Sequence, residues 1–367
     1  MGTLSCNSCM YMLDGCNGYC GDMIIQTAGG EECEGLNFNG ATCESLGYTQ
    51  GGDLACSIGC RLNVSLCHQF SLISTGTQHA CGLTLAGSAY CWGENSSGQL
   101  GDGSVTSRGV PAAVAGGLSF VQVSAGAYHT CGLTSTGTVY CWGYNDHGQL
   151  GDNSTTERWV PTAVQGGVSF DQIALGSSHT CGLTAASEVY CWGKNNYGQL
   201  GDNSTTDRWI PSVVQGGNMF NALSTGYAHS CGLTADGTAL CWGQNDQGQL
   251  GDGTTSNHIV PTTVLGTIPF SSIELGTAST CALSESGMAY CWGGNTFGQL
   301  GINTTTSTSL PSAVFGELSF ASVSVGFFFT CVRTSAGASY CWGWNSAGQL
   351  GDGTTTKRYI PTPVNPL

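Results

Sequence analysis

Short runs of apolar and β-branched residues alternate with glycine-containing breaks along most of this chain. Between Phe120 and Trp142 the sequence FVQVSAGAYHTCGLTSTGTVYCW holds three such runs, rich in Val, Tyr, Thr and Leu. Residues 125–126 separate the first two runs and residues 135–137 separate the last two. Runs of this length and composition between turn residues predict three short β-strands.

The same pattern returns every 50 residues from Cys81 onward without an insertion or deletion. A strand-like unit of about 40–50 residues cannot bury its own apolar face, so it must stack on neighbouring copies. We therefore predict an all-β fold, a β-propeller in which six 50-residue blades form a ring over residues 69–367. A seven-bladed ring and an unclosed array are the alternatives.

The break at residues 135–137 is a three-residue hairpin loop ending in glycine, where the turn needs a left-handed residue. Ser187 replaces this glycine in one copy, so we expect slight backbone strain there. Folding about the loop places Cys131 opposite Cys141, at a Cα separation that a disulfide accepts. Two-cysteine metal half-sites are the rival interpretation. The predicted disulfides are Cys81–Cys91, Cys131–Cys141, Cys181–Cys191, Cys231–Cys241, Cys281–Cys291 and Cys331–Cys341.

Every unit continues with the motif C-W-G-x-N-x-x-G-Q-L-G, as in CWGYNDHGQLGDNSTTERWVP from Cys141 to Pro161, and G-x-x-H-T-C precedes it in Gly126 to Cys131. This text resembles the repeats of the regulator of chromosome condensation family, in the cysteine-paired version of exported bacterial proteins. The resemblance covers about residues 70–367. It implies four-stranded blades and keeps a seventh blade open as an alternative.

Charge argues against the founding activities of that family, chromatin binding and nucleotide exchange on a small GTPase. The chain has 8 Lys+Arg against 23 Asp+Glu, a net charge of −15, and its uniform period leaves no room for an inserted loop. An acidic surface repels phosphate backbones. We therefore expect no nucleic acid among its partners.

Cysteine content predicts the compartment. A total of 21 Cys in 367 residues is typical of an exported protein with a disulfide framework. No apolar stretch reaches the ~20 residues of a membrane span. We expect an extracellular or cell-surface protein whose export leader lies outside this numbering.

Residues 1–68 are predicted to form a separate, small disulfide-rich loop module, because they hold nine cysteines and little apolar material. The text CGDMIIQTAGGEECEG, ATCESLGY and ACSIGCRLNVSLC resembles the cysteine-rich repeats of secreted myxobacterial-type proteins. Nine is odd, so one thiol is free or bonded elsewhere. Solvated carboxylates are the preferred interpretation of Asp22, Glu31, Glu32 and Glu34, with a calcium site as the alternative.

The repeated polar residues favour a scaffold over an enzyme, and we expect no catalytic residue, no metal in the propeller and no cofactor. A histidine stands two residues before the first hairpin cysteine in four units and is interpreted as a structural hydrogen-bonding residue. An aspartate follows G-Q-L-G in five units and is interpreted as a turn residue that accepts local backbone N–H bonds. These residues are His79, His129, His179 and His229, and Asp102, Asp152, Asp202, Asp252 and Asp352.

Several exposed features are candidates for modification or contact. The glycosylation sequons are at Asn63, Asn95, Asn153, Asn203 and Asn303, although asparagine at 153 and 203 also suits a left-handed backbone. Aromatic residues Trp159, Trp209 and Tyr359 stand where other units have small or aliphatic residues, so contact with sugar or a subunit competes with inter-blade packing. The last unit departs from the repeat at Phe327, Phe328, Phe329 and Arg333, which predicts an interface.

These observations favour a non-catalytic secreted or cell-surface structural protein. The preferred form is a self-assembling building block, for example of a filament, whose partners are copies of itself or other surface proteins or glycans. The alternative is a soluble binding module that recognises a protein or glycan through one propeller face.

Overall fold

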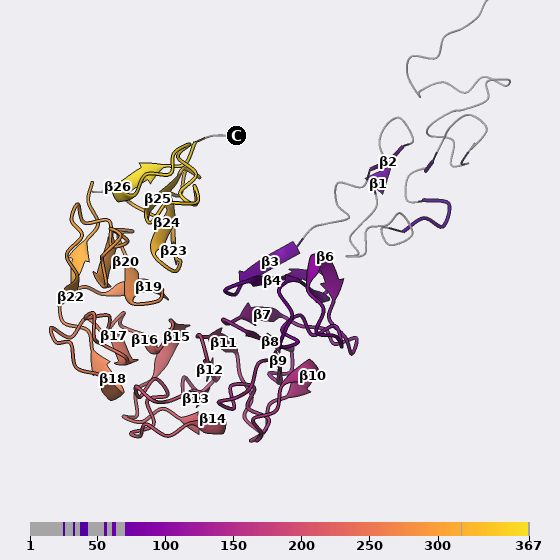
Figure 1. Cartoon of the computed structure of the whole chain (residues 1–367), viewed down its shortest axis with the longest axis horizontal. Helices are drawn as coiled ribbons and strands as arrows, with labels where there is room; N and C mark the ends of the chain where they lie inside the picture. The colour runs from indigo at the N-terminus through magenta and orange to yellow at the C-terminus, as the bar shows by residue number, and fades with distance from the viewer. Residues whose placement is uncertain are drawn as a thin grey trace, which may run out of the picture.

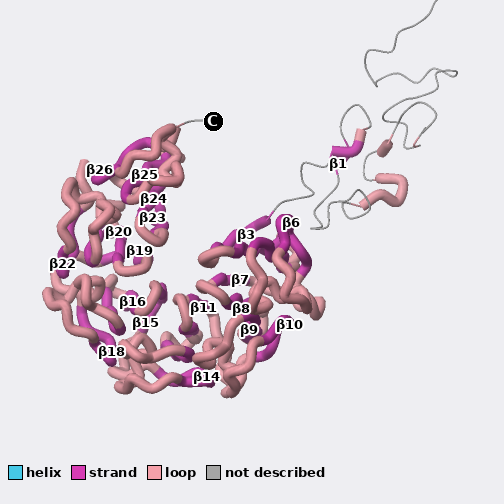
Figure 2. The backbone as a smooth tube through the Cα atoms, in the orientation of Figure 1, coloured by secondary structure: helices cyan, strands magenta, loops and turns pink. Residues whose placement is uncertain are grey.

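The computed structural model describes residues 25, 32–33, 37–42, 55–56, 61–63, 70–316 and 318–365. Within these ranges every regular element is a β-strand (Figure 2). A short pair, β1 (Ala55–Cys56) and β2 (Leu62–Asn63), precedes six four-stranded antiparallel sheets. The predicted six-bladed all-β propeller with four-stranded blades is confirmed.

Each blade uses four consecutive strands. Blade 1 holds β3 (Phe70–Thr75), β4 (His79–Thr84), β5 (Ala89–Gly93) and β6 (Arg108–Ala113). Blade 2 holds β7 (Gln122–Ala125), β8 (His129–Leu133), β9 (Val139–Gly143) and β10 (Arg158–Ala163). Blade 3 holds β11 (Gln172–Leu175), β12 (His179–Leu183), β13 (Val189–Gly193) and β14 (Arg208–Val213).

The remaining three blades follow the same order. Blade 4 holds β15 (Phe220–Thr225), β16 (His229–Thr234), β17 (Ala239–Gly243) and β18 (His258–Thr263). Blade 5 holds β19 (Phe270–Leu275), β20 (Ser279–Ser284), β21 (Ala289–Gly293) and β22 (Thr308–Ala313). Blade 6 holds β23 (Ser322–Val325), β24 (Phe329–Arg333), β25 (Ser339–Gly343) and β26 (Arg358–Pro363).

The hairpin register is the one predicted. Cys131 of β8 lies opposite Cys141 of β9, and the two form a disulfide with a Cα separation of 4.1 Å. The equivalent pair is bonded in each of the other five blades. Ser187, which replaces the loop glycine, has a φ of 62°, so the expected strain is present.

The core lies between blades. The side of each blade turned toward the preceding blade, here called the leading face, presents a phenylalanine, an aliphatic residue and a tryptophan. In blade 3 these are Phe170, Ile173 and Trp192, and they pack on Leu133 and the disulfide of blade 2. The side that receives them is called the trailing face. A buried side chain of this size contributes roughly 1.5–3 kcal/mol, so each junction holds its two blades together.

The ring of blades is open. Figure 1 shows the blades in an arc, with blade 1 (β3–β6) and blade 6 (β23–β26) on either side of a gap. Ile73 on the leading face of blade 1 is 58% exposed, whereas its counterpart Val123 in blade 2 is 2% exposed. The prediction of a closed ring is therefore wrong, because blade 6 does not cover blade 1, and the six blades take the unclosed form given above as an alternative.

Outside the propeller, a disulfide joins Cys33 to Cys56. The Glu32 carboxylate accepts a hydrogen bond from Arg61 (2.7 Å) and another from the Leu62 backbone N–H (3.0 Å). Glu32 is one of the four carboxylates of the alternative calcium site, and here it is engaged in these two hydrogen bonds. The other three lie outside the described residues, as do the remaining cysteines of the module, including the predicted odd thiol.

Candidate functional site

One end of the propeller is built from the two loops that follow the first and third strands of each blade. In blade 2 these loops, residues 126–128 and 144–157, are joined by a bond from the Tyr144 N–H to the Tyr128 carbonyl oxygen (2.9 Å). The hairpin loops and the connections between blades lie at the opposite end, where the Phe170 N–H bonds to the Gly137 carbonyl oxygen (2.9 Å). The two ends are therefore formed by different parts of the repeat.

A buried asparagine fixes the longer loop. Oδ1 of Asn145 accepts the Leu150 N–H (3.0 Å), and Nδ2 donates to the carbonyl oxygens of Ser154 (3.1 Å) and Thr156 (2.9 Å). Equivalent bonds are made in all six blades. One side chain thus replaces the backbone pairing that a strand would supply, and it makes the loop a rigid platform.

The aspartate after G-Q-L-G is a turn residue, as predicted. The Asp152 carboxylate accepts the Ser154 N–H (3.1 Å) and pairs with Arg158 (2.7 Å). Burial alone would raise the pKa of Asp152, but hydrogen bonds from Ser154 and Arg158 outweigh this effect and hold that pKa below its usual value. The carboxylate is therefore ionised, and its hydrogen bonds are made within the loop.

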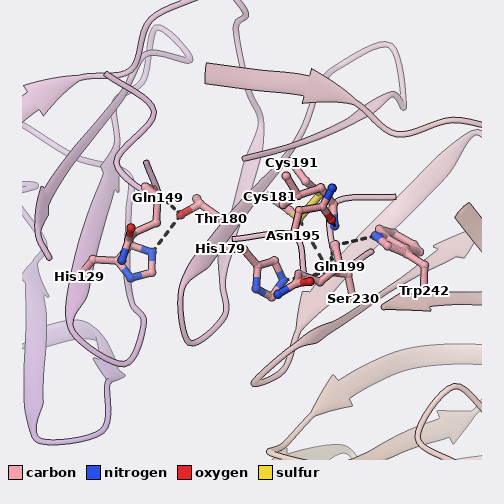
Figure 3. Close-up of a disulfide and its surroundings, with 11 residues drawn as sticks. His129, Gln149, His179, Thr180, Cys181, Cys191, Asn195, Gln199, Ser230 and Trp242 are labelled. Atoms are coloured by element: carbon pink, nitrogen blue, oxygen red, sulfur yellow. Dashed lines mark hydrogen bonds between the residues drawn. A yellow bond between two sulfur atoms is a disulfide. The ribbon is translucent and has the colours of Figure 1, made fainter. Parts of the chain in front are cut away.

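The histidines are structural, as predicted. Thr180 Oγ1 donates to the Gln149 carbonyl oxygen (2.9 Å), so the same oxygen accepts a hydrogen bond from the His129 Nε2–H, also at 2.9 Å (Figure 3). This bond crosses from blade 2 to blade 3. Burial lowers the pKa of His129 to about 3, which keeps the ring neutral. Among the described residues no three His, Cys, Asp or Glu side chains are placed to hold a metal ion.

The rigid platform carries side chains that differ from blade to blade, and many are aromatic. We call this surface the aromatic face; it comprises Tyr128, Tyr144, Tyr197, Tyr227, Phe297, Phe327, Phe328 and Trp344, with Trp159, Trp209 and Tyr359 at its rim. Tyr227 is 49% exposed and Phe327 is 45% exposed. Several of these residues were not singled out from the sequence. They could have been found in the sequence, because aromatic residues recur there at the positions of the repeat that vary between units.

The aromatic residues at the rim fit both interpretations given above, packing between blades and contact with a partner. The Trp159 side chain lies over Gly98 of blade 1, where a Cβ atom would come within 2.4 Å of it. The Trp159 carbonyl oxygen also accepts the Gly103 N–H across the same junction (2.9 Å). Trp159 nevertheless remains 48% exposed, so it packs between blades and still presents a surface.

The structure separates the four predicted interface residues of the last unit. Phe328 packs against Phe297 of blade 5 with a ring separation of 4.8 Å, and exposed Phe327 contacts Phe328 at 5.7 Å. Phe329 stands in the place of the structural histidine and lines the axial cavity. Arg333 is exposed on the trailing face of blade 6. Only Phe327 and Phe328 therefore belong to the aromatic face.

A cavity of about 430 Å³ lies on the propeller axis. One short loop from each blade lines it, mostly with Gly, Ala, Ser and Thr, and Tyr227, Phe327 and Phe329 contribute its aromatic residues. Its lining contains no charged residue. The cavity shares Tyr227 and Phe327 with the aromatic face, so the two form one continuous site.

The sequons differ in accessibility. Asn153, Asn203 and Asn303 are exposed and have φ values of 60–62°, so each occupies the left-handed conformation that glycine has in other blades. Asn95 is completely buried and donates to the Ser104 and Thr106 carbonyl oxygens, both at 3.1 Å. It is the loop-fixing asparagine of blade 1, so glycosylation there is incompatible with the fold. The side chain of Asn63 lies outside the described residues.

Comparisons with known proteins agree with this architecture. The sequence model of the RCC1-like domain matches residues 38–367, so the chain belongs to that family. The comparison with curated proteins returned no match. The match begins within the range predicted for the cysteine-rich module, whose boundary at residue 68 stays a prediction.

Solved structures show the same fold. Prp20p of Saccharomyces cerevisiae, described with its binding properties to Gsp1p and histones, is 24% identical with a TM-score of 0.71, covering 89% of this chain and 84% of that chain. Human WBSCR16 is 23% identical with a TM-score of 0.74, covering 82% of each chain. The CRINKLY WD40 ectodomain of the Arabidopsis thaliana receptor kinase ACR4 is 22% identical with a TM-score of 0.50, covering 81% and 82%.

Proposed function

We propose that this chain is a non-catalytic, secreted or cell-surface interaction protein that recognises a protein or glycan partner through the aromatic face. The observation that carries the proposal is the division of roles within the repeat. Residues that recur from blade to blade are buried and used for bonds within and between blades, as in Asn145, present in all six, and His129, whose equivalents occur in four. Exposed residues at one end differ between blades, and many of them are aromatic. A surface of that kind presents large contact area with little loss of side-chain entropy.

Export is supported by the six blade disulfides and by Cys33–Cys56, since such bonds persist in oxidising compartments. In the described part of the chain, no helix is long and apolar enough to cross a membrane. The net charge of −15 disfavours a nucleic-acid partner. Related propellers include a protein studied for binding Gsp1p and histones and a receptor-kinase ectodomain, so interaction is a role that this fold supports.

Replacing two exposed aromatics of this face is expected to weaken binding. Tyr227→Ser combined with Phe327→Ser removes apolar contacts beside the axial cavity, and anchors of this kind contribute about 2 kcal/mol or more at interfaces. We expect at least a tenfold loss of binding of the labelled protein to the surface of the cells that produce it. Prior digestion of the cells with protease or glycosidases would identify the partner's class.

The matched control uses the opposite end of the propeller. Met219 and Leu265 are exposed apolar residues in connections between blades, at 57% and 52% exposure. Met219→Ser combined with Leu265→Ser should leave binding unchanged. Equal losses in both double variants would refute the assignment of the aromatic face.

Self-assembly is the second candidate, favoured by Phe327, an apolar side chain of the aromatic face that is 45% exposed. If copies associate through the aromatic face, the single variant Phe327→Ser should yield monomers with an unchanged melting temperature. Particle size by native mass spectrometry and thermal unfolding provide the two readouts. A wild-type protein that is already monomeric at micromolar concentration would rule out the building-block form.

A further inference from the structure

The two open ends of the propeller are chemically unlike. Blade 1 retains the apolar leading face of an interior blade, with Phe70 stacked on Trp92 at 5.6 Å and Ile73 beside them. In every other blade the equivalent tryptophan is fully buried by the preceding blade. The leading face of blade 1 therefore has the composition of a surface that another element covers. Apolar side chains that remain in water do not gain the free energy of burial.

The trailing face of blade 6 does not supply the matching surface. Arg333 replaces the leucine that packs at interior junctions, and Ser339 replaces valine or alanine. Both residues are exposed. Covering Arg333 with the apolar face of blade 1 would bury an unpaired charge, which is strongly unfavourable.

The histidine hydrogen bond that links blades at four of the five interior junctions is also lost at both ends; only the junction of blades 5 and 6, which has Ser279 in place of the histidine, lacks it as well. At the junction of blades 2 and 3, His129 donates to Thr180. The corresponding positions at the opening are Phe329 in blade 6 and Ala80 in blade 1, which can form no such bond. Neither ring closure nor head-to-tail packing of copies would therefore reproduce an interior junction.

We propose that the leading face of blade 1 is the docking site for the amino-terminal segment, residues 1–69, of the same chain. This segment runs directly into Phe70, the first residue of that face, and its 69 residues exceed the 50-residue period of a blade. The RCC1-like match begins at residue 38, ahead of the first blade. Covalent attachment also gives the segment an effective concentration near millimolar, which a second copy does not have.

The direct test places a photo-crosslinking residue on this face of the full chain. Ile73→p-benzoylphenylalanine is expected to give an intrachain link to residues 1–69, identified by peptide mapping and independent of protein concentration. Ser339→p-benzoylphenylalanine, exposed on the other side of the opening, is the matched control and should give no such link. A concentration-dependent link to a second copy, or no link from position 73 to residues 1–69, would overturn the proposal.

A second variant tests docking without a photo-crosslinking residue. Ile73→Asp should release the segment, and cleavage by a broad-specificity protease between residues 43 and 69 should accelerate at least tenfold. Leu85→Asp, on the exposed hairpin loop of the same blade, should leave that rate unchanged. Equal rates for wild type and Ile73→Asp would contradict docking.

Discussion

The free energy of unfolding is expected to fall steeply as pH drops from 6.5 toward 4, through the buried histidines. Burial lowers the pKa of His79 to about 4 and those of His129, His179 and His229 to about 3. In the unfolded chain these rings have pKa values near 6.5. Below that pH the unfolded state binds protons that the native state does not, so stability is lost. The cost is roughly 2 kcal/mol per histidine at pH 5 and several kcal/mol for the four together.

Denaturant unfolding at pH 7, 6 and 5, with the disulfides intact, measures this loss. The control is His129→Phe, which copies the residue that blade 6 carries at Phe329. It should reduce the slope of stability against pH by about one quarter. Glu274 opposes the trend, because desolvation raises its pKa to about 7, but its side chain is exposed to solvent, which weakens its contribution to stability. A slope unchanged by His129→Phe would show that buried histidines do not govern acid unfolding.

The lowered aspartate pKa values affect the free energy of unfolding in a separate, more acidic pH range. The pKa of Asp152 is held below its usual value, so its contribution is present at neutral pH and is lost only below about pH 4. Two phases of acid destabilisation are therefore expected, histidine first and aspartate second.

Asn145→Ala is expected to destabilise the protein by about 3–5 kcal/mol, because it leaves the Leu150 N–H and the Ser154 and Thr156 carbonyl groups without their partner in a buried site. The loop of residues 144–157 should also lose its protection from hydrogen exchange. Asn153→Gly is the control, since glycine occupies that left-handed position in three other blades. It should change stability by less than about 1 kcal/mol. Equal effects of the two substitutions would remove the special role of the buried asparagine.

Local register was predictable from the sequence, but burial was not. The loop glycine at 137 determines which residues face each other, so the Cys131–Cys141 bond followed from counting. Asn95 and Asn153 both begin a sequon, yet one is buried and the other exposed. Only the arrangement of the loops decides which asparagine is used internally.

Interfaces between elements distant in sequence were also beyond prediction. Phe327, Phe328 and Phe329 are consecutive, but β24 begins at Phe329, so that residue follows strand geometry while the other two lie in a loop. Ile73 and Val123 occupy the same repeat position, and only the absence of a preceding blade exposes Ile73. The aromatic face required knowledge of which loops share one end of the propeller.

Hydroxyl-radical footprinting of the chain, free and bound to the cells that produce it, tests the central claim most directly. Oxidation reports side-chain exposure at aromatic residues and methionine in a single experiment. We predict protection of Tyr128, Tyr227 and Phe327 on the aromatic face, with Met219 at the opposite end oxidised equally in both states. Protection of Met219 with unchanged oxidation of Tyr227 and Phe327 would contradict the account.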